Sequence, residues 1–388
     1  MPLMACGKMP LPKGIVTGVQ CESVLRRSTK PRGCHRFANG PIPCHAVAGF
    51  ARPVDAAMKR LFAAAGLLLL ALVMLAAGAW GALALLYSGP HSDGVRTALG
   101  SLFALVAVAA VVALPVKRWR WRMAGVFLLA FAAALGWYFS LEPSNDRDWQ
   151  ADVAVLPYAT VDGDFVTVHN IRNFDYRSEL DYQPAYYDRR FDVSKLEGVD
   201  AVAVYWMGPA IAHVFVSFAF AGGDHLAVSI ETRKEKGEAY STVKGFFRQY
   251  ELYYVVADER DVIRLRTNYR KDPPEDVYVY RTRAPVENVR RLFLDYVREI
   301  NSLRTHPEFY NTLTTNCTTN IWAHTLVNPG HPPFNWKILA SGYVPEYLYE
   351  SGRLDTSVPF AELQKRALVN ARAQAADQAA DFSRQIRQ

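Results

Sequence analysis

The chain has 388 residues, a formal net charge of +7 and 51% hydrophobic residues, which allows one large domain plus an appendage. Its apolar residues gather in three runs near the N-terminus, and this excludes an ordinary water-soluble single domain. Much of the positive charge lies in the flanks of these runs and in the N-terminal arm, so it does not indicate nucleic-acid binding.

Residues 1–57 differ in composition from the rest of the chain. They hold four of the five cysteines, many Pro and Gly, and no helical or strand periodicity. We expect a disordered arm or an over-called start, because MKRLFAAAGLLLL from Met58 has the basic-then-apolar form of an N-terminal anchor. The pairs Cys34-His35 and Cys44-His45 match no standard ligand spacing, so no metal or other cofactor is predicted.

Residues 58–141 are predicted to form a three-helix transmembrane anchor. The apolar runs at 61–87, 97–116 and 123–141 each reach the ~20 residues that a helix needs to cross a bilayer. A buried core helix or a cleaved signal peptide would explain one such run, but three close together indicate a membrane protein.

The basic residues around these runs predict the orientation. KRWRWR at 117–122 joins the second and third runs, and a Lys-Arg pair precedes the first, whereas the connector HSDGVR balances Arg96 with Asp93. Basic loops stay in the cytoplasm, so everything from about Glu142 onward should be exported. We therefore expect a multi-pass protein of the bacterial inner membrane with its C-terminal domain in the periplasm.

The exported segment at 142–360 is predicted to be α+β, an antiparallel sheet with packed helices. Its first half contains β-branched and aromatic stretches bounded by Gly, Pro and Asp that predict strands: FVTVHNI, VDAVAVYW, HVFVSFAF, HLAVSIE, LYYVVAD and DVYVYRT. Apolar residues recur with helical spacing at 286–303, and a second helix should begin at Cys317. Residues 361–388 are predicted to be a polar helical tail.

The stretch ADERDVIRLRTNYR at 257–270 is read as a further strand. A regular strand would place Arg264, Arg266 and Arg270 on one face. There they would form a solvated ladder of ion pairs with the acidic residues of the same stretch, or contact lipid phosphates.

Cys317, in NTLTTNCTTN, is the one cysteine of the exported segment. An unpaired thiol in an oxidising compartment is either buried or used. Asn316 is a good N-cap, which places Cys317 in the first turn of a helix. The free N–H groups and the helix dipole there favour the thiolate, so we expect Cys317 to be a nucleophile.

A general base is predicted on a hairpin upstream of this cysteine. IAHVFVSFAFAGGDHLAVSIETR, at 211–233, places the turn at 221–225. A symmetric loop would put His213 on one face with Ser229, Glu231 and Arg233, leaving the alternate apolar residues as the buried side. Glu231 would then lie diagonally across from His213, close enough to orient its ring. The alternative is a purely structural histidine.

The stretch from Asn145 to about Asn320 resembles the Lnb-type exported domain. The likeness is carried by NDRDW, VHNIRNFDYRSELDY, IAHVFVSF, VSIETRKEKGEAYS, GFFRQYELYYVVADERDVIRLRTNYR and PEFYNTLTTNCTTN. This family includes a bacterial lipoprotein N-acyltransferase and is similar to the permuted NlpC/P60 (papain-like) cysteine enzymes. The resemblance implies a permuted papain-like fold, with Cys317 as the nucleophile and His213 as the base.

The third polar position of the site stays open. The lecithin:retinol acyltransferase relatives carry a second histidine on the neighbouring strand, which His225 matches in spacing, but our hairpin puts His225 in the turn. We therefore favour Glu231, with Ser229 as a further candidate.

The resemblance also implies acyl transfer through a thioester. Cys317 would attack a lipid ester, and a lipoprotein amine would take the acyl group, with Arg233 and Asn316 as candidate substrate-binding residues. The expected partners are thus a phospholipid, a lipoprotein and the membrane. Two alternatives remain: a cysteine hydrolase of cell-envelope peptides or amides, and a non-catalytic envelope scaffold.

Overall fold

The computed structural model describes residues 53–89 and 92–388. The prediction of a disordered arm or over-called start at 1–57 therefore lies outside the described residues, apart from residues 53–57, which begin the first helix.

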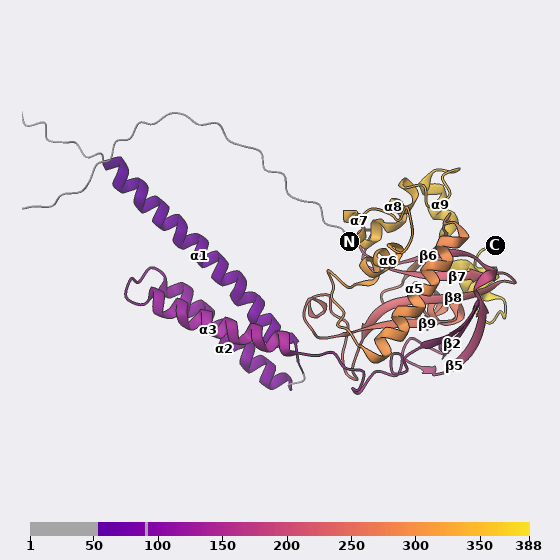
Figure 1. Cartoon of the computed structure of the whole chain (residues 1–388), viewed down its shortest axis with the longest axis horizontal. Helices are drawn as coiled ribbons and strands as arrows, with labels where there is room; N and C mark the ends of the chain where they lie inside the picture. Colours follow the sequence, from indigo (N-terminus) through magenta and orange to yellow (C-terminus); the bar gives the residue numbers. More distant parts are fainter. Residues whose placement is uncertain (1–52, 90–91) are drawn as a thin grey trace, which may run out of the picture. The chain divides into compact units, whose positions relative to one another are not determined.

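Three apolar helices open the described chain, and they are α1 (Pro53–Tyr87), α2 (Asp93–Ala113) and α3 (Arg120–Ser140) (Figure 1). Each is long and apolar enough to cross a membrane, so the three predicted helices are confirmed. Small residues let α1 and α2 pack closely, since a Cβ added at Gly78 would lie 2.6 Å from the Cβ of Ala107.

The following domain is built on an eight-stranded sheet with the order β1-β2-β9-β8-β7-β6-β10, in which β5 also pairs with β2. The strands are β1 (Tyr158–Asp162), β2 (Phe165–Arg172), β5 (Tyr186–Asp192), β6 (Leu196–Tyr205), β7 (Ala212–Phe220), β8 (Asp224–Arg233), β9 (Glu251–Ala257) and β10 (Asp276–Arg281). Described neighbours run antiparallel except where Arg172 meets Ala257 between β2 and β9. A small second sheet joins β3 (Asp175–Tyr176) to β4 (Tyr182–Gln183).

All six predicted strands are present, as β2 and β6 to β10. The edge strands β1 and β5 were not predicted. The sequence of β5, YYDRRFD, carries three charged residues at its exposed centre, which hides the apolar alternation on which strand prediction depends.

Helices cover both faces of this sheet, whereas we expected only one side of the hairpin to be buried. On one face Val216, Phe218 and Ile230 pack against α5 (Val286–Thr305), which lies across the strands (Figure 1). On the other face Phe215 and Ala227 pack against α4 (Glu259–Arg264) and C-terminal residues. The side chains of His213, Ser229 and Glu231 share this second face by strand alternation.

The strand predicted at 257–270 is wrong beyond its first residues. After β9 the chain forms α4 and then a π-helical turn, η3 (Leu265–Tyr269). Asp258 starts the helix, because its carboxylate accepts a hydrogen bond from the N–H of Arg260 at 2.9 Å. Arg264 and Arg266 are therefore buried on helical turns.

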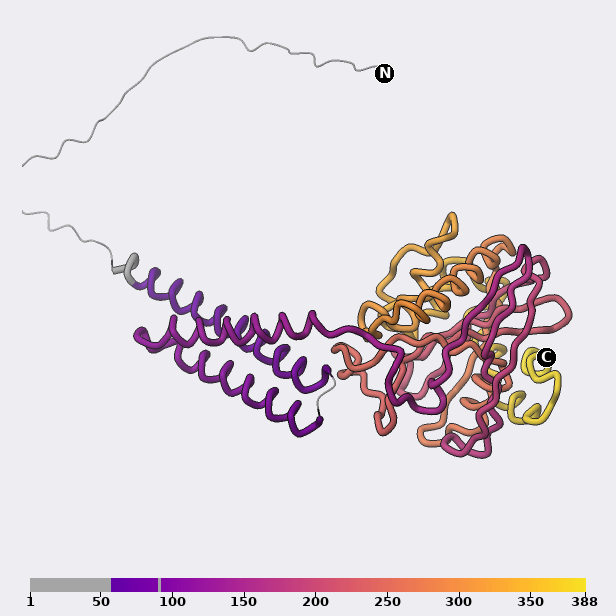
Figure 2. The backbone as a smooth tube through the Cα atoms, turned by 60° about the horizontal axis from the view of Figure 1, so that its bottom comes forward, coloured from indigo at the N-terminus to yellow at the C-terminus, as the bar shows by residue number. Residues whose placement is uncertain are grey.

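Residues 361–388 form helices, as predicted, but some of their apolar side chains pack against the sheet. This part of the chain contributes α9 (Phe360–Ala367), α10 (Asn370–Ala375) and α11 (Phe382–Gln385), and the end of the chain folds back beside the sheet (Figure 2). Phe382 and Ile386 are fully buried in the core of the second face. The run of alanines misled the prediction because few large apolar residues mark the buried stripe.

Three more helices lie between α5 and this segment: α6 (Cys317–Thr325), α7 (Trp336–Leu339) and α8 (Val344–Glu350). Short 3-10 turns complete the domain as η1 (Val193–Lys195), η2 (Lys244–Phe246) and η4 (Ser341–Tyr343). The α+β class is thus confirmed, and the histidine strand β7 precedes the cysteine helix α6. The likeness to permuted NlpC/P60 enzymes stays a prediction.

Candidate active site

Cys317 is the first residue of α6, as predicted. The side chain of Asn316 accepts hydrogen bonds from the N–H groups of Thr318 and Thr319 at 3.0 and 2.9 Å, and the Thr319 hydroxyl accepts one from the N–H of Asn316. This capping box fixes the start of the helix. The Asn316 amide also donates to the carbonyl of Thr312 at 2.7 Å, so both ends of this predicted substrate-binding group hold the loop and the helix together.

The thiol lies at the open end of the β7–β8 hairpin. The paired register between these strands stops at Val216 and Val228. Beyond it, the backbone N–H of Val214 donates a hydrogen bond to the sulfur of Cys317 instead. Val214 directly follows His213 on β7, so the thiol meets the strand next to the proposed base, although successive side chains of a strand point to opposite faces.

The imidazole of His213 is joined to the two polar residues opposite it. Its Nε2 lies 2.7 Å from the hydroxyl of Ser229 and 3.6 Å from Oε1 of Glu231. Ser229 donates to the same Glu231 oxygen at 2.8 Å. Within the described residues no hydrogen bond joins the thiol to this imidazole. The negative charge of Glu231 contributes to the raised pKa of Cys317 and opposes the lowering of the pKa of His213.

Burial disfavours the charged forms of both Cys317 and His213. Burial raises the pKa of the Cys317 thiol, and the opposing hydrogen bonds from the N–H groups of Val214 and Thr318 do not outweigh it. The prediction that the helix start keeps a thiolate is therefore wrong for the resting site. Burial likewise lowers the pKa of His213 from 6.5 to about 3, with a further lowering by Arg266 that Glu231 opposes.

Arg266 is the site residue that the sequence did not reveal. Its guanidinium lies 3.0 Å from Oε1 of Glu231 and 3.4 Å from Glu275. Burial disfavours an ionised Glu231, but Arg266 and then His213 hold the pKa of this carboxyl well below its usual range. The alternating charges around Arg266 favoured the prediction of a strand, and on that strand the side chain of Arg266 would face solvent.

A tyrosine beside the thiol was missed as well. Tyr296 of α5 is fully buried, and its hydroxyl has no hydrogen-bond partner among the described residues. Burial raises the pKa of its hydroxyl, and Tyr296 belongs to the apolar core against which Cys317 packs. In the sequence Tyr296 is one apolar residue among several on the buried stripe of α5.

The remaining predicted residues lie elsewhere. His225 is not in the turn but in β8, six residues from Glu231 along an extended strand, or about 20 Å. Arg233 is buried under Trp149 and donates to the carbonyls of Val153 and Ala154, both at 2.9 Å. The structure brings neither residue to the thiol. His225 lies at the other end of β8, and the guanidinium of Arg233 is already bound to backbone carbonyls.

His225 belongs to a different polar cluster. Its ring, Asp200 and Glu259 offer ligand atoms that lie within 4.8 Å of one another. Both carboxylates are already paired with Arg387, each at 2.6 Å. A metal ion would have to displace this guanidinium, so the donor set does not favour a metal centre.

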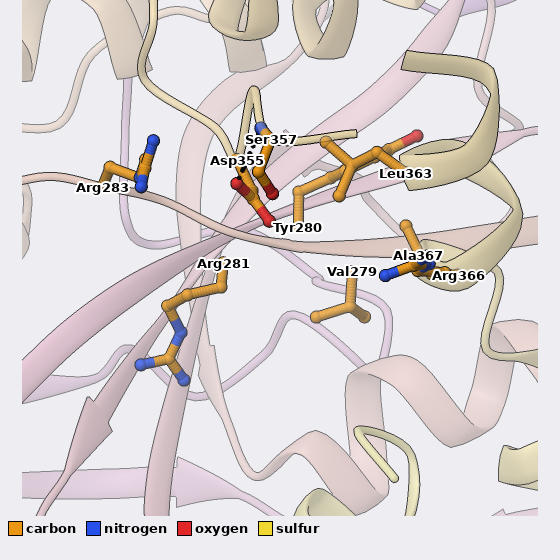
Figure 3. A pocket seen from close by; sticks show the side chains of 9 residues that line it. All are labelled: Val279, Tyr280, Arg281, Arg283, Asp355, Ser357, Leu363, Arg366 and Ala367. Carbon is orange, nitrogen blue, oxygen red and sulfur yellow. Dashed lines mark hydrogen bonds between the residues drawn. The ribbon is translucent and has the colours of Figure 1, made fainter. Parts of the chain in front are cut away.

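A small apolar pocket of about 70 Å³ lies beside Thr318, the residue that follows Cys317. Val214, Thr318 and Ile321 line it together with residues of α8. A larger, open pocket of about 640 Å³ lies between β10 and α9, where Asp355 and Ser357 face Arg283 (Figure 3). Its lining includes neither Cys317 nor His213.

Comparison with known families bears on the segment that contains these residues. Residues 182–342 match the Lnb N-terminal periplasmic domain. The Lnb-type segment includes His213, Ser229, Glu231, Arg266 and Cys317, and it stops before α8 to α11. No curated protein and no solved structure matches the chain. Together with the three apolar helices, the match indicates a membrane protein with a periplasmic C-terminal domain.

Proposed function

We propose that the protein is a thiol acyltransferase of the bacterial inner membrane, which moves an acyl chain from a phospholipid ester to a lipoprotein amine. The observation that carries the proposal is the thiol of Cys317 at the start of α6, hydrogen-bonded by the N–H that follows His213. Acyl transfer of this kind requires a nucleophile, a base and a group that orients the base, and Cys317, His213 and Glu231 would take these parts.

In the first half-reaction the Cys317 thiol gives its proton to His213 as the sulfur attacks the ester carbonyl. A C–S bond forms and the ester C–O bond breaks, and His213 returns the proton to the departing lysolipid alkoxide. In the second half-reaction a lipoprotein amine attacks the thioester. The C–N bond forms, the C–S bond breaks, and the amine proton passes through His213 to the sulfur.

The surrounding groups support these steps in different ways. Glu231 and Ser229 orient the imidazole and favour its protonated form, while Arg266 keeps Glu231 ionised. The backbone N–H of Cys317, at the helix start, can donate to the oxyanion that develops on the carbonyl. The apolar pocket beside Val214 and Ile321 suits the first carbons of an acyl chain.

The test is a deletion strain complemented with the full chain or with Cys317→Ser. Mass spectrometry of lipoprotein N-termini should show loss of N-acylation in the deletion strain and in Cys317→Ser. A change confined to cell-wall peptides would assign hydrolysis instead, because the same thioester can be released by water. Full complementation by Cys317→Ser would leave a scaffold role and remove the enzyme proposal.

A further inference from the structure

Four exposed apolar side chains, which we call the apolar rim, lie on the loops beside the active site. They are Tyr240, Val243, Phe246 and Leu313, with exposed fractions of 48%, 49%, 43% and 51%. Aromatic residues of this kind are typical of protein surfaces at the membrane–water interface. Lys244 lies within the same loop and carries the positive charge that lipid phosphates attract.

Hydrogen bonds make the two loops of the apolar rim a single surface. Thr312 donates from its N–H to the carbonyl of Gly245 at 2.8 Å and from its hydroxyl to that of Thr242 at 2.9 Å. The approach is close, because a Cβ at Gly245 would lie 2.3 Å from the hydroxyl oxygen of Thr312. Leu313 is thereby fastened beside Val243 and Phe246.

The chain places this surface near the bilayer. Helix α3 ends at Ser140, and the N–H of Ser144 already donates to Glu251 at the start of β9. Residues 141–144 span at most about 14 Å, so the Glu251 carboxylate that Ser144 binds is held near the helix end. The segment that leads from the apolar rim into β9 is therefore tied close to the membrane surface.

Contacts with the helix ends support this placement. Arg248, two residues after the apolar rim, donates to the carbonyls of Tyr138 and Leu141 at 3.0 and 2.7 Å. The ring of Phe247 lies 6.0 Å from that of Tyr87, the last residue of α1. Both helix ends belong to the exported side of the predicted topology.

We propose that the apolar rim inserts into the periplasmic leaflet of the membrane that anchors the chain. We assign lipid as the occupant of this surface, because the residues next to the apolar rim contact the ends of α1 and α3, where these helices leave the membrane. The turn that carries Leu313 leads directly into the Asn316 cap, so insertion holds Cys317 beside the lipid ester groups. The lipid contact itself does not require acyl transfer; only the role in substrate delivery rests on the proposed function.

The experiment places a photo-crosslinking amino acid at position 243 or 313 of the full chain, in a Cys317→Ala background that removes any chemistry. The protein is reconstituted in vesicles of phosphatidylethanolamine and phosphatidylglycerol, illuminated and analysed by mass spectrometry. The matched control is position 180, where Leu180 is 90% exposed on the turn between β3 and β4. Lipid adducts should be several-fold more abundant at 243 and 313 than at 180.

Equal adduct yields at all three positions, or adducts only to another protein or to a second copy, would overturn the proposal. A second measurement addresses delivery in the unlabelled protein with its thiol intact. Val243→Glu should slow acyl transfer from vesicle lipids several-fold while leaving reaction with a water-soluble short-chain thioester unchanged. Retained activity on both substrates would remove the delivery role, whereas loss of both would reflect misfolding and would equally count against it.

Discussion

Two polar clusters stand at opposite ends of the β7–β8 hairpin, and they contain similar residue types. The cluster at the open end holds His213, Glu231 and Arg266, and the cluster near the turn holds His225 and Glu259. Near the turn the strands stay paired and a guanidinium saturates the carboxylates. At the open end the pairing stops and a thiol takes the freed N–H. A histidine with carboxylates is therefore common to both clusters, and the proposed site differs from the other in its unpaired strand end and its thiol.

The largest effect on activity is expected from replacing Cys317, which only the cluster at the open end has beside it. We expect Cys317→Ala to lower acyl transfer by more than about 10³-fold, since catalytic units of this kind fail when the attacking atom is lost. The measurement is transfer from labelled phospholipid to a diacylated lipopeptide. Unfolding by urea should be unaffected, and residual activity near wild type would contradict the mechanism.

The second largest effect is expected from the histidines, because replacing His213 should reduce kcat/KM far more than replacing His225. His213→Ala is expected to cost about 10²-fold or more in kcat/KM, the usual range for loss of a general base. His225→Ala, the matched control near the turn, should leave kcat/KM within a few-fold of wild type. Comparable losses in both variants would mean that the two clusters act together.

The pH profile sharpens the same contrast. His213 has a pKa of about 3 and stays neutral, and the pKa of Cys317 is raised above its ordinary value of 9.0. Neither group titrates between about pH 5 and 8, so kcat/KM should lack an acidic limb near the ordinary histidine pKa and should rise toward alkaline pH. A limb at the ordinary histidine pKa would show that burial does not control His213.

The cluster near the turn should respond in stability rather than in activity. Arg387→Ala leaves the buried carboxylate of Glu259 without its ion-pair partner, while Asp200 keeps Arg281, and we expect this to cost about 3 kcal/mol of unfolding free energy. Urea titration measures the loss. Activity per folded molecule should be retained, and a loss of activity without a loss of stability would place Arg387 in the catalytic machinery.

Tyr296→Phe is expected to give the smallest effect. If its hydroxyl stabilises charge on the sulfur or the substrate, the variant should lose about ten-fold in kcat, equivalent to one hydrogen bond. Stability should not fall, because the hydroxyl has no partner to lose among the described residues. Tyr280→Phe, on β10, serves as the control and should leave kcat unchanged.

The sequence predicted the parts of this arrangement that follow from local pattern. Strand alternation placed Ser229 and Glu231 on the face of His213, and the Asn316 cap located the start of α6. These succeed because a side-chain period of two and a capping residue are set by neighbouring residues. The family resemblance added the order of base and nucleophile.

What the sequence could not supply depends on contacts between distant segments. The protonation of Cys317 is decided by burial under packed elements, which the helix dipole alone does not reveal. Arg266 reaches Glu231 because a capped helix replaces the expected strand. His225 matched a plausible spacing, yet spacing does not tell which end of a strand is open.

The second face of the sheet is completed late along the chain. Phe215 of β7 meets a core that includes Phe382 and Ile386, contributed more than 160 residues further on. During export, therefore, strands β6 to β8 emerge before the helices that cover them. The apolar second face of the sheet stays exposed to water until residues up to Ile386 have crossed the membrane. Such long-range closure is slow, so the nascent domain is prone to aggregation while translocation finishes.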